Sequence, residues 1–253
     1  MRLAAIAMLA AVPWVAFTLL LRFVVSMEGW PVGLVGTFSR MVTLPLLAAW
    51  VLATGRGWRR LLPDGVLGWL LVMGGFSLII NLCWFGSVQW TTATNVSMLF
   101  RTDLVFVVLI GMVLGIERVG RAQLAVLPVM LLGLALVTEI QNFDLGGHLV
   151  GDLMAVCAAF GLAANAFVIR HIMRVMDEEA VALYNHAIST LGFVAVGVIG
   201  GGFSRTSELL HQPKPLFLVV VLGVIATVAL PLYYVALRRM SVWKLRTFML
   251  SVP

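Results

Sequence analysis

The sequence has 253 residues, of which 62% are hydrophobic and 11% charged, and its mean hydropathy is +1.07. Soluble domains are roughly 45–50% apolar and about 25% charged, so this composition excludes a soluble globular protein. The formal charge of +6 is spread over short loops between apolar runs. That spread suits membrane topology and lipid headgroups, and we expect no nucleic-acid partner. The composition predicts an all-α polytopic membrane protein.

The chain divides into apolar runs long enough to span a bilayer, which takes roughly 20 helical residues. The first run is too long for a signal-peptide core, so we expect it to remain as a helix. Eight full helices are predicted, at Leu3–Val25, Pro31–Ala53, Gly65–Val88, Thr91–Gly115, Arg121–Thr138, Gly151–Met173, Ala180–Gly200 and Pro215–Leu237. Part of a ninth begins at Ser241 and stops at Pro253.

Basic residues fall in alternate connections between these runs, at Arg2, at Arg56, Arg59 and Arg60, at Arg118 and Arg121, at Arg170 and Arg174, and at Arg238, Arg239 and Lys244. Connections rich in Lys and Arg lie on the cytoplasmic side of membrane proteins. The opposite connections carry little net charge. The pattern predicts a multi-pass protein of the bacterial inner (plasma) membrane with a cytoplasmic N-terminus.

The chain also contains an internal repeat. AVPWVAFTLLLR, which ends at Arg22, aligns with AAFGLAANAFVIR, which ends at Arg170; Arg40 falls opposite His186, and Trp84-Phe85 opposite Tyr233-Tyr234. A unit of five helices has odd parity, so its second copy enters the membrane inverted, and inverted repeats are typical of transporters. We therefore predict two inverted repeats of five helices, in residues 1–140 and 150–253. The second repeat lacks the rest of its fourth helix and its fifth, so we expect a truncated copy.

At these residues the chain resembles the EamA-type transporters of the drug/metabolite transporter superfamily. The segment TTATNVSMLFRTDLVFVVLIGMVLGIERVGRAQLAVLPVMLLGLALV is similar to the fourth and fifth helices of that family, with Glu117, Gln123 and Gly133 at matching places. VGDLMAVCAAFGLAANAFVIRHI resembles its sixth helix. The family often has a proline in the fourth helix, where this chain has Leu104; Pro253 reproduces it in the ninth. The resemblance implies a secondary active transporter of a small metabolite.

Helical periodicity indicates which faces are buried, because residues at i, i+3 and i+7 share one face. Four runs place small residues and then one polar group on such a face: Gly33, Gly36 and Arg40; Gly74, Ser77 and Asn81; Thr94, Ser97 and Arg101; and Ala158, Gly161 and Asn165. A polar group on such a stripe must face protein or water. We expect substrate-binding residues among Arg101, Asp103, Arg40, Asn81, Asn165 and Trp14.

Arg101 and Asp103 lie in the middle of an apolar run, where ionisable residues are costly and indicate function. They are poor partners on one helix, because two residues correspond to roughly 200° of rotation. Either Arg40 or a residue of another helix must satisfy Asp103, and an Arg40–Asp103 pair would leave Arg101 for substrate. Arg101 is either an anion-binding group or half of a structural ion pair. Arg40, Arg101 and Asp103 together carry a net positive charge, which favours an anionic or zwitterionic solute.

Proton coupling is the second role that the sequence suggests, for Asp103 or His186, because both groups can titrate in a suitable environment. The alternative for His186 is a hydrogen-bonded packing residue. No catalytic motif is present, so we expect no enzyme, and no nucleotide-binding loop that could drive a pump. Cys83 and Cys157 lack C-x-x-C spacing, and we expect no disulfide, metal or cofactor.

The expected partners are a small-molecule solute and the lipid bilayer, with a second copy in a homodimer as a further candidate. The alternative function is that of a non-transporting membrane subunit or degenerate paralogue, which the short C-terminal repeat would favour.

Overall fold

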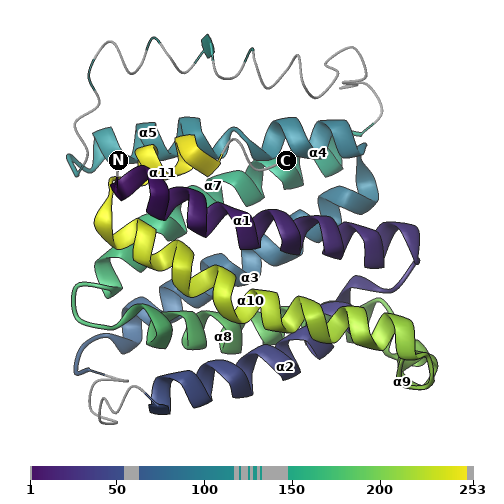
Figure 1. Cartoon of the computed structure of the whole chain (residues 1–253). Helices are drawn as coiled ribbons and strands as arrows, with labels where there is room; N and C mark the ends of the chain where they lie inside the picture. The colour runs from purple at the N-terminus through teal and green to yellow at the C-terminus, as the bar shows by residue number, and fades with distance from the viewer. Residues whose placement is uncertain are drawn as a thin grey trace.

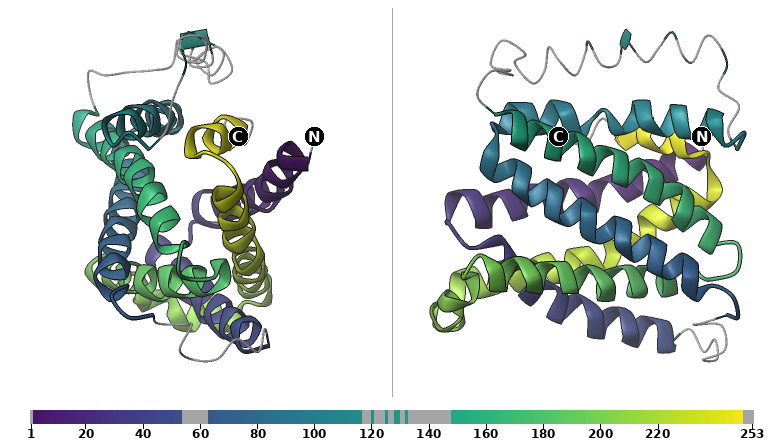
Figure 2. Two further views of the ribbon diagram at one scale, coloured as in Figure 1. Left: turned by 90° about the vertical axis from the view of Figure 1, so that its left-hand side faces the viewer. Right: turned by 180° about the vertical axis from the view of Figure 1, so that it is seen from behind.

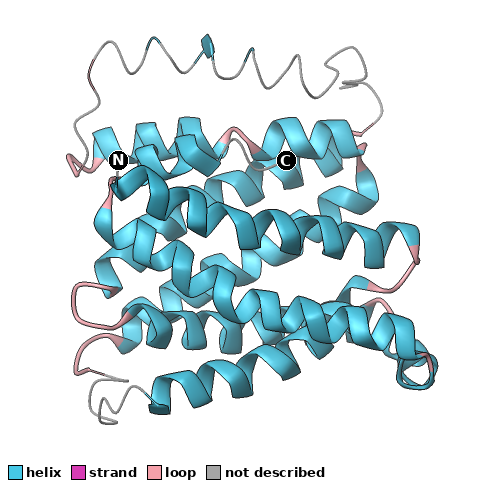
Figure 3. Cartoon of the chain, viewed as in Figure 1, coloured by secondary structure: helices cyan, strands magenta, loops and turns pink. Residues whose placement is uncertain are grey.

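We describe the chain from a computed structural model, which describes residues 2–53, 63–116 and 148–249, with Gly120, Ala125, Pro128, Val129 and Leu132. Every regular element in these residues is helical, in agreement with the predicted all-α class (Figure 3). In chain order they are α1 Arg2–Arg22, the π-helical η1 Phe23–Met27, α2 Val32–Ala53, α3 Leu67–Trp90, α4 Ala93–Phe100, α5 Asp103–Val113, α7 Leu149–Ile172, α8 Glu178–Ile199, the 3-10 helix η4 Gly202–Arg205, α9 Thr206–His211, α10 Pro213–Arg239 and α11 Val242–Met249.

Seven helical segments of the described residues are long and apolar enough to cross a membrane, and α4 with α5 supplies one of them. The start of α1, the α7–α8 turn and the α10–α11 connection lie at one end of the molecule, and α9 lies at the other (Figure 1). Seven predicted helices thus find their counterparts. The predicted helix Arg121–Thr138, and Glu117, Gln123, Gly133 and Pro253, lie outside the described residues, apart from four single positions of that helix.

The predicted single helix Thr91–Gly115 is wrong in one respect, because it is broken at Arg101 and Thr102. The amides of Arg101 and Thr102 donate to the carbonyls of Met98 and Leu99, three residues back, at 3.2 and 3.1 Å. The Thr102 hydroxyl also donates to the Leu99 carbonyl, at 2.6 Å. Hydrogen bonds to the third preceding residue, in place of the fourth, end α4. The helix α5 then begins with Asp103 in its first turn, where a carboxylate interacts favourably with the helix dipole.

The small-residue stripes lie at contacts between helices that are distant in sequence. A Cβ at Gly33 would come within 2.3 Å of the Gly197 backbone of α8, and a Cβ at Gly36 within 2.1 Å of the Phe193 ring. A Cβ at Gly223 of α10 would come within 2.6 Å of the Ser39 carbonyl of α2, and the Gly223 carbonyl accepts from Thr43 at 2.9 Å. Close backbone approach of this kind is how helices associate in lipid.

Contacts between helices connect the described part of the bundle. The pairs α3–α7, α2–α8, α1–α10, α2–α10 and α3–α8 pack together, and α4 and α5 lie along α7 (Figure 2). The stripe Thr94, Ser97 and Arg101 is the exception, because Ser97 is exposed and Arg101 lies beyond the end of α4.

Gly33→Ala is expected to destabilise the protein, because its new Cβ would collide with Gly197 backbone atoms that cannot rotate away. Overpacking of this kind costs about 1–3 kcal/mol. Gly75→Ala is the matched control, because a Cβ there meets nothing within 4 Å. Thermal unfolding in detergent should show a lower midpoint for Gly33→Ala alone; equal midpoints for the two variants would contradict the observed α2–α8 packing.

Candidate functional site

The predicted site residues lie inside their spanning segments, away from the ends of each span. They are Trp14 of α1, Arg40 of α2, Asn81 of α3, Arg101 and Asp103 at the α4–α5 break, Asn165 of α7 and His186 of α8. The structure brings them together in three groups.

The first group surrounds an ion pair between Asp103 and Arg246 of α11. The Arg246 Nη1 lies 3.4 Å from the Asp103 carboxylate, and the two side chains are only 10% and 9% exposed. Arg246 also donates to the carbonyl of Leu162 at 3.4 Å, and its guanidinium lies 5.3 Å from the centre of the Tyr233 ring. One buried arginine therefore joins α5, α7, α10 and α11.

The partner of Asp103 decides between two sequence-based alternatives. Asp103 is satisfied from another helix, by Arg246, and the Arg40–Asp103 pair is not formed. Arg101 lies within electrostatic reach of Asp103 but does not make its ion pair. Instead the Arg101 Nη1 donates to the carbonyl of Met249 at 3.2 Å. The α4–α5 break and α11 are thus joined twice, by the Arg101–Met249 hydrogen bond and by the Arg246–Asp103 ion pair.

Aromatic side chains extend this group toward α1 and α8. Trp14 packs edge-on against Tyr233, with ring centres 6.5 Å apart. The Tyr233 ring lies 5.8 Å from that of Tyr234, and the Tyr234 hydroxyl accepts from Asn185 of α8 at 2.9 Å. Successive contacts thus run from Trp14 through Tyr233 and Tyr234 to Asn185 of α8, and the Arg246 guanidinium lies over the Tyr233 ring.

The second group is an amide cluster between α3 and α7. The Asn165 Nδ2 donates to the Ser77 hydroxyl at 3.1 Å, and the Asn81 Nδ2 donates to the Ser77 carbonyl at 2.8 Å. The Asn165 Oδ1 is buried and has no hydrogen-bond partner among the described residues. Because Asn165 lies one helical turn beyond Leu162, this cluster is adjacent to the Arg246 contact on α7.

The third group is a pair of basic side chains between α2 and α8. Arg40 lies over the Phe193 ring, 5.4 Å from its centre, and within electrostatic reach of His186. In the described part of the chain, the buried Nε and Nη1 of Arg40 have no hydrogen-bond partner. The His186 ring lies against the backbone of Ala226 in α10. Buried polar groups are normally satisfied, so this cluster requires an explanation.

Sequence analysis missed two residues that organise the core. Arg246 is an ionisable residue inside the ninth apolar run, which was the available signal. Asp152 of α7 accepts from Thr91 at 2.6 Å and from Asn95 at 3.0 Å, and so fastens the start of α7 to the turn between α3 and α4. Its contact with two polar residues 57 and 61 positions away had no sequence signal.

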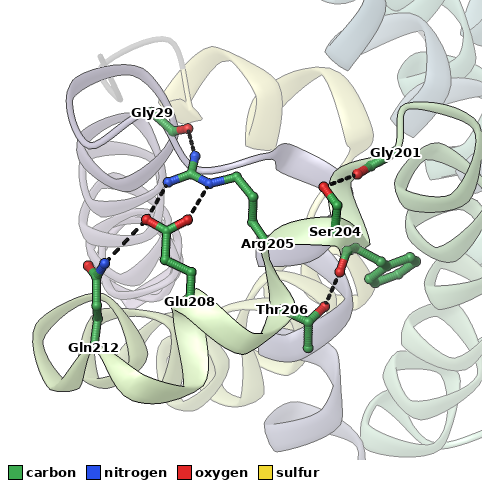
Figure 4. A network of polar contacts seen from close by, with 8 residues as sticks. Gly29, Gly201, Ser204, Arg205, Thr206, Glu208 and Gln212 are labelled. Atoms are coloured by element: carbon green, nitrogen blue, oxygen red, sulfur yellow. Dashed lines mark hydrogen bonds and ion pairs between the residues drawn. The ribbon is translucent and has the colours of Figure 1, made fainter.

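At the end of the molecule that carries α9, Arg205 forms a polar network outside the spanning helices (Figure 4). Its guanidinium donates to Glu208 at 2.7 and 2.9 Å and to the Gly29 carbonyl at 2.9 Å. It also lies over the Trp30 ring, 4.4 Å from its centre. The network thereby ties the η4–α9 connection to the α1–α2 turn.

This network should respond to acid. The hydrogen bonds and charge of Arg205 hold the pKa of Glu208 below its ordinary value of 4.5. A lowered carboxylate pKa contributes stability above the ordinary value, and that contribution is lost as pH falls through the folded-state value. Glu208→Gln should therefore lower the thermal midpoint slightly at neutral pH and not at all in acid. A difference that persists undiminished in acid would contradict the ion pair.

These elements define a multi-pass helical membrane protein whose core contains a buried ion pair and broken helix. The sequence model of the EamA-like transporter family matches residues 1–139, more than half of the chain, and the chain belongs to that family. The resemblance found in the sequence is thus confirmed, and the protein is a transporter rather than an enzyme.

Relatives agree with this assignment. The chain is 25% identical over 222 residues to an "Uncharacterized transporter" of Archaeoglobus fulgidus, covering 84% of this chain and 73% of the relative. It also resembles a protein of known crystal structure, with a TM-score of 0.76 and 18% identity, over 100% of this chain and 85% of the other. At that identity the likeness shows a shared fold.

Proposed function

We propose that the protein is a secondary active transporter that moves a small metabolite across the bacterial inner membrane by alternating access. The observation that carries this proposal is the Asp103–Arg246 ion pair, which is buried at the broken helix and joins the two halves of the chain. Ionisable residues inside spanning segments mark substrate and ion pathways. Broken helices form midplane sites in many secondary transporters.

The contacts between helices support two inverted repeats, in residues 1–140 and 150–253. The sequence repeat pairs α1 with α7, α2 with α8, α3 with α10, and α4 and α5 with α11. A twofold axis between the repeats would exchange the two members of each pair. The α3–α7 contact would then have a counterpart in α1–α10, the α3–α8 contact in α2–α10, and the α5–α7 contact in α1–α11. All six contacts are present. The contacts α2–α8 and α5–α11 exchange into themselves. This is the pattern expected of a pseudo-twofold axis between the repeats.

The orientation follows from the basic residues. The C-terminal ends of α7 and α10 lie at the same end of the molecule as the N-terminus (Figure 1). Arg170, Arg238 and Arg239 lie in the last turns of these helices, and Arg174 lies in the turn that follows α7. The positive-inside rule places this end in the cytoplasm.

The charges of the core favour an anionic or zwitterionic solute. The three groups together contain three arginines, Arg40, Arg101 and Arg246, and one aspartate, Asp103, so they carry excess positive charge. The guanidinium of Arg40 has buried donor atoms without a partner among the described residues. A carboxylate or phosphate group suits such donors. Asn81, Asn165 and Trp14 would supply the remaining polar and aromatic contacts.

Asp103 is our proposed coupling residue. Its pair with Arg246 links α5 of one repeat to α11 of the other, so neutralising the carboxylate would release that link. A proton or the solute's own charge could do this, which would couple binding to the motion of the repeats. His186 of α8 is the second candidate for proton coupling, because an imidazole can titrate in a suitable environment.

Metabolite profiling of cells and medium after expression of the full-length gene tests the proposal, with Arg101→Ala alongside. Transport predicts that one solute class shifts across the membrane with the gene. Loss of the shift in Arg101→Ala would place Arg101 at the site; an equal shift would make Arg101 a structural charge held on α11. No shift with either, at confirmed expression, would favour the non-transporting subunit and overturn the proposal.

A further inference from the structure

Asp152 lies in the first turn of α7 and plays no part in the function proposed above. The residue is only 4% exposed. Its Oδ1 accepts hydrogen bonds from the Thr91 hydroxyl at 2.6 Å and from the Asn95 amide at 3.0 Å. Its Oδ2 is also buried and has no hydrogen-bond partner among the described residues. One oxygen of this carboxylate is therefore satisfied, and the other is not.

Asp152 also lacks a basic partner in the described part of the chain. Four other acidic residues there form ion pairs with Lys or Arg at 3.4 Å or less: Glu28, Asp103, Glu178 and Glu208. Asp152 is more buried than Asp103, which is 6% exposed. Taking a carboxylate out of water is costly unless a cation or hydrogen bonds compensate its charge. The most buried of these five acids is thus the one without a countercharge.

The known contacts compensate this carboxylate only in part. The 2.6 Å hydrogen bond from the Thr91 hydroxyl has the length of a charge-assisted bond to an ionised carboxylate. The N-terminus of α7 adds the positive end of a helix dipole, which is equivalent to about half an elementary charge. Neither contact supplies a ligand to Oδ2. A cation at Oδ2 would complete both the charge balance and the coordination of Asp152.

The C-terminal end of α3 supplies further oxygen atoms beside Asp152. The helix ends at Trp90, and the last carbonyls of a helix have no partner within it. A Cβ at Gly151, the residue before Asp152, would come within 2.7 Å of the Trp90 carbonyl oxygen, so α7 begins in contact with this helix end. In secondary transporters, helix C-terminal ends and unwound backbone carbonyls coordinate sodium ions. The α3–α4 turn and the start of α7 together present this type of ligand.

We propose that Asp152 binds a sodium ion, with the Thr91 hydroxyl and the Trp90 carbonyl as further ligands. One carboxylate among neutral oxygens balances the charge of a monovalent cation, whereas calcium sites draw on several carboxylates. The ion would join the α3–α4 turn to α7, in addition to the two hydrogen bonds on Oδ1. Exposed tryptophans mark the level of lipid headgroups, and Trp90 is 62% exposed, so the site is within reach of ions from the aqueous side.

Thermal unfolding of the full chain in detergent tests this inference, in sodium chloride and in choline chloride at the same ionic strength. The wild-type midpoint should rise with sodium concentration, because a ligand that binds only the folded state stabilises it. Asp152→Asn preserves the size of the side chain and should weaken the apparent sodium affinity by about 10- to 100-fold, as expected for the loss of one charged ligand. Asp64→Asn is the matched control, because it removes an exposed carboxylate and should respond like the wild type.

Three results would overturn the inference. They are equal wild-type midpoints in the two salts, an undiminished sodium response in Asp152→Asn, and an equal loss of the response in Asp64→Asn. Thr91→Val is a second variant, for use if Asp152→Asn does not fold. It removes the hydroxyl ligand with little change in shape, and it should weaken the sodium response by about 10-fold. An unchanged response in Thr91→Val would remove this hydroxyl from the site and contradict the proposed ligand set.

Discussion

Arg246→Met is expected to lower the free energy of unfolding by about 3–5 kcal/mol, because it would leave the buried Asp103 carboxylate without its partner. The variant also loses the donor to Leu162 and the cation over Tyr233. Equilibrium unfolding in mixed micelles measures the change. Lys244→Met is the control on the same helix, because Lys244 is exposed, and it should change stability little.

The double variant Asp103→Leu/Arg246→Met separates the charge from the packing. Removing both members of a buried ion pair is often neutral or stabilising, so the double variant should recover most of the stability lost in Arg246→Met. It should nevertheless be inactive in transport if Asp103 couples the repeats. Wild-type stability of Arg246→Met would show that the Asp103–Arg246 pair does not form.

Arg40→Met should have the opposite effect on stability. The buried Nε and Nη1 of Arg40 have no hydrogen-bond partner in the described residues, so its removal relieves a cost of about 1–3 kcal/mol. The thermal midpoint should therefore rise. Transport of the solute found by profiling should fall by about 10- to 100-fold, which corresponds to the loss of one charged hydrogen bond.

Arg239→Met serves as the control for Arg40→Met, because this exposed arginine of α10 should change neither quantity. A marked loss of stability in Arg40→Met would mean that Arg40 is paired within the protein. A higher midpoint with unchanged transport would remove Arg40 from the solute site while leaving the transporter assignment intact.

The helices were predictable because the hydropathy of a segment indicates whether it can span a bilayer, and this does not depend on which helices pack against it. The stripes were predictable for a related reason: only small residues permit the approach seen between Gly33 and Gly197, and Asn165 reaches Ser77 because Gly161 lets α7 approach Ile80 of α3. Both signals are local in the sequence.

The break in the α4–α5 span and the partner of Asp103 could not be predicted in the same way. The residues from Thr94 to Val113 have the hydropathy of one continuous span, and nothing in that average marks the turn at Arg101. Arg246 is 143 positions from Asp103, and only the packing of α11 beside α5 brings them together. Several arginines were equally plausible partners from charge alone.

The accessibility of Asn165 tests the central claim, which is that the core opens to both sides of the membrane in turn. Asn165→Cys, in a chain with Cys83→Ser and Cys157→Ser, is treated with a membrane-impermeant thiol reagent in right-side-out and inside-out vesicles. Ala159→Cys on the same helix, at a fully buried packing position, is the control and should stay unlabelled. Alternating access predicts labelling of Asn165→Cys from both sides; labelling from one side alone, or from neither in a folded variant, would contradict it.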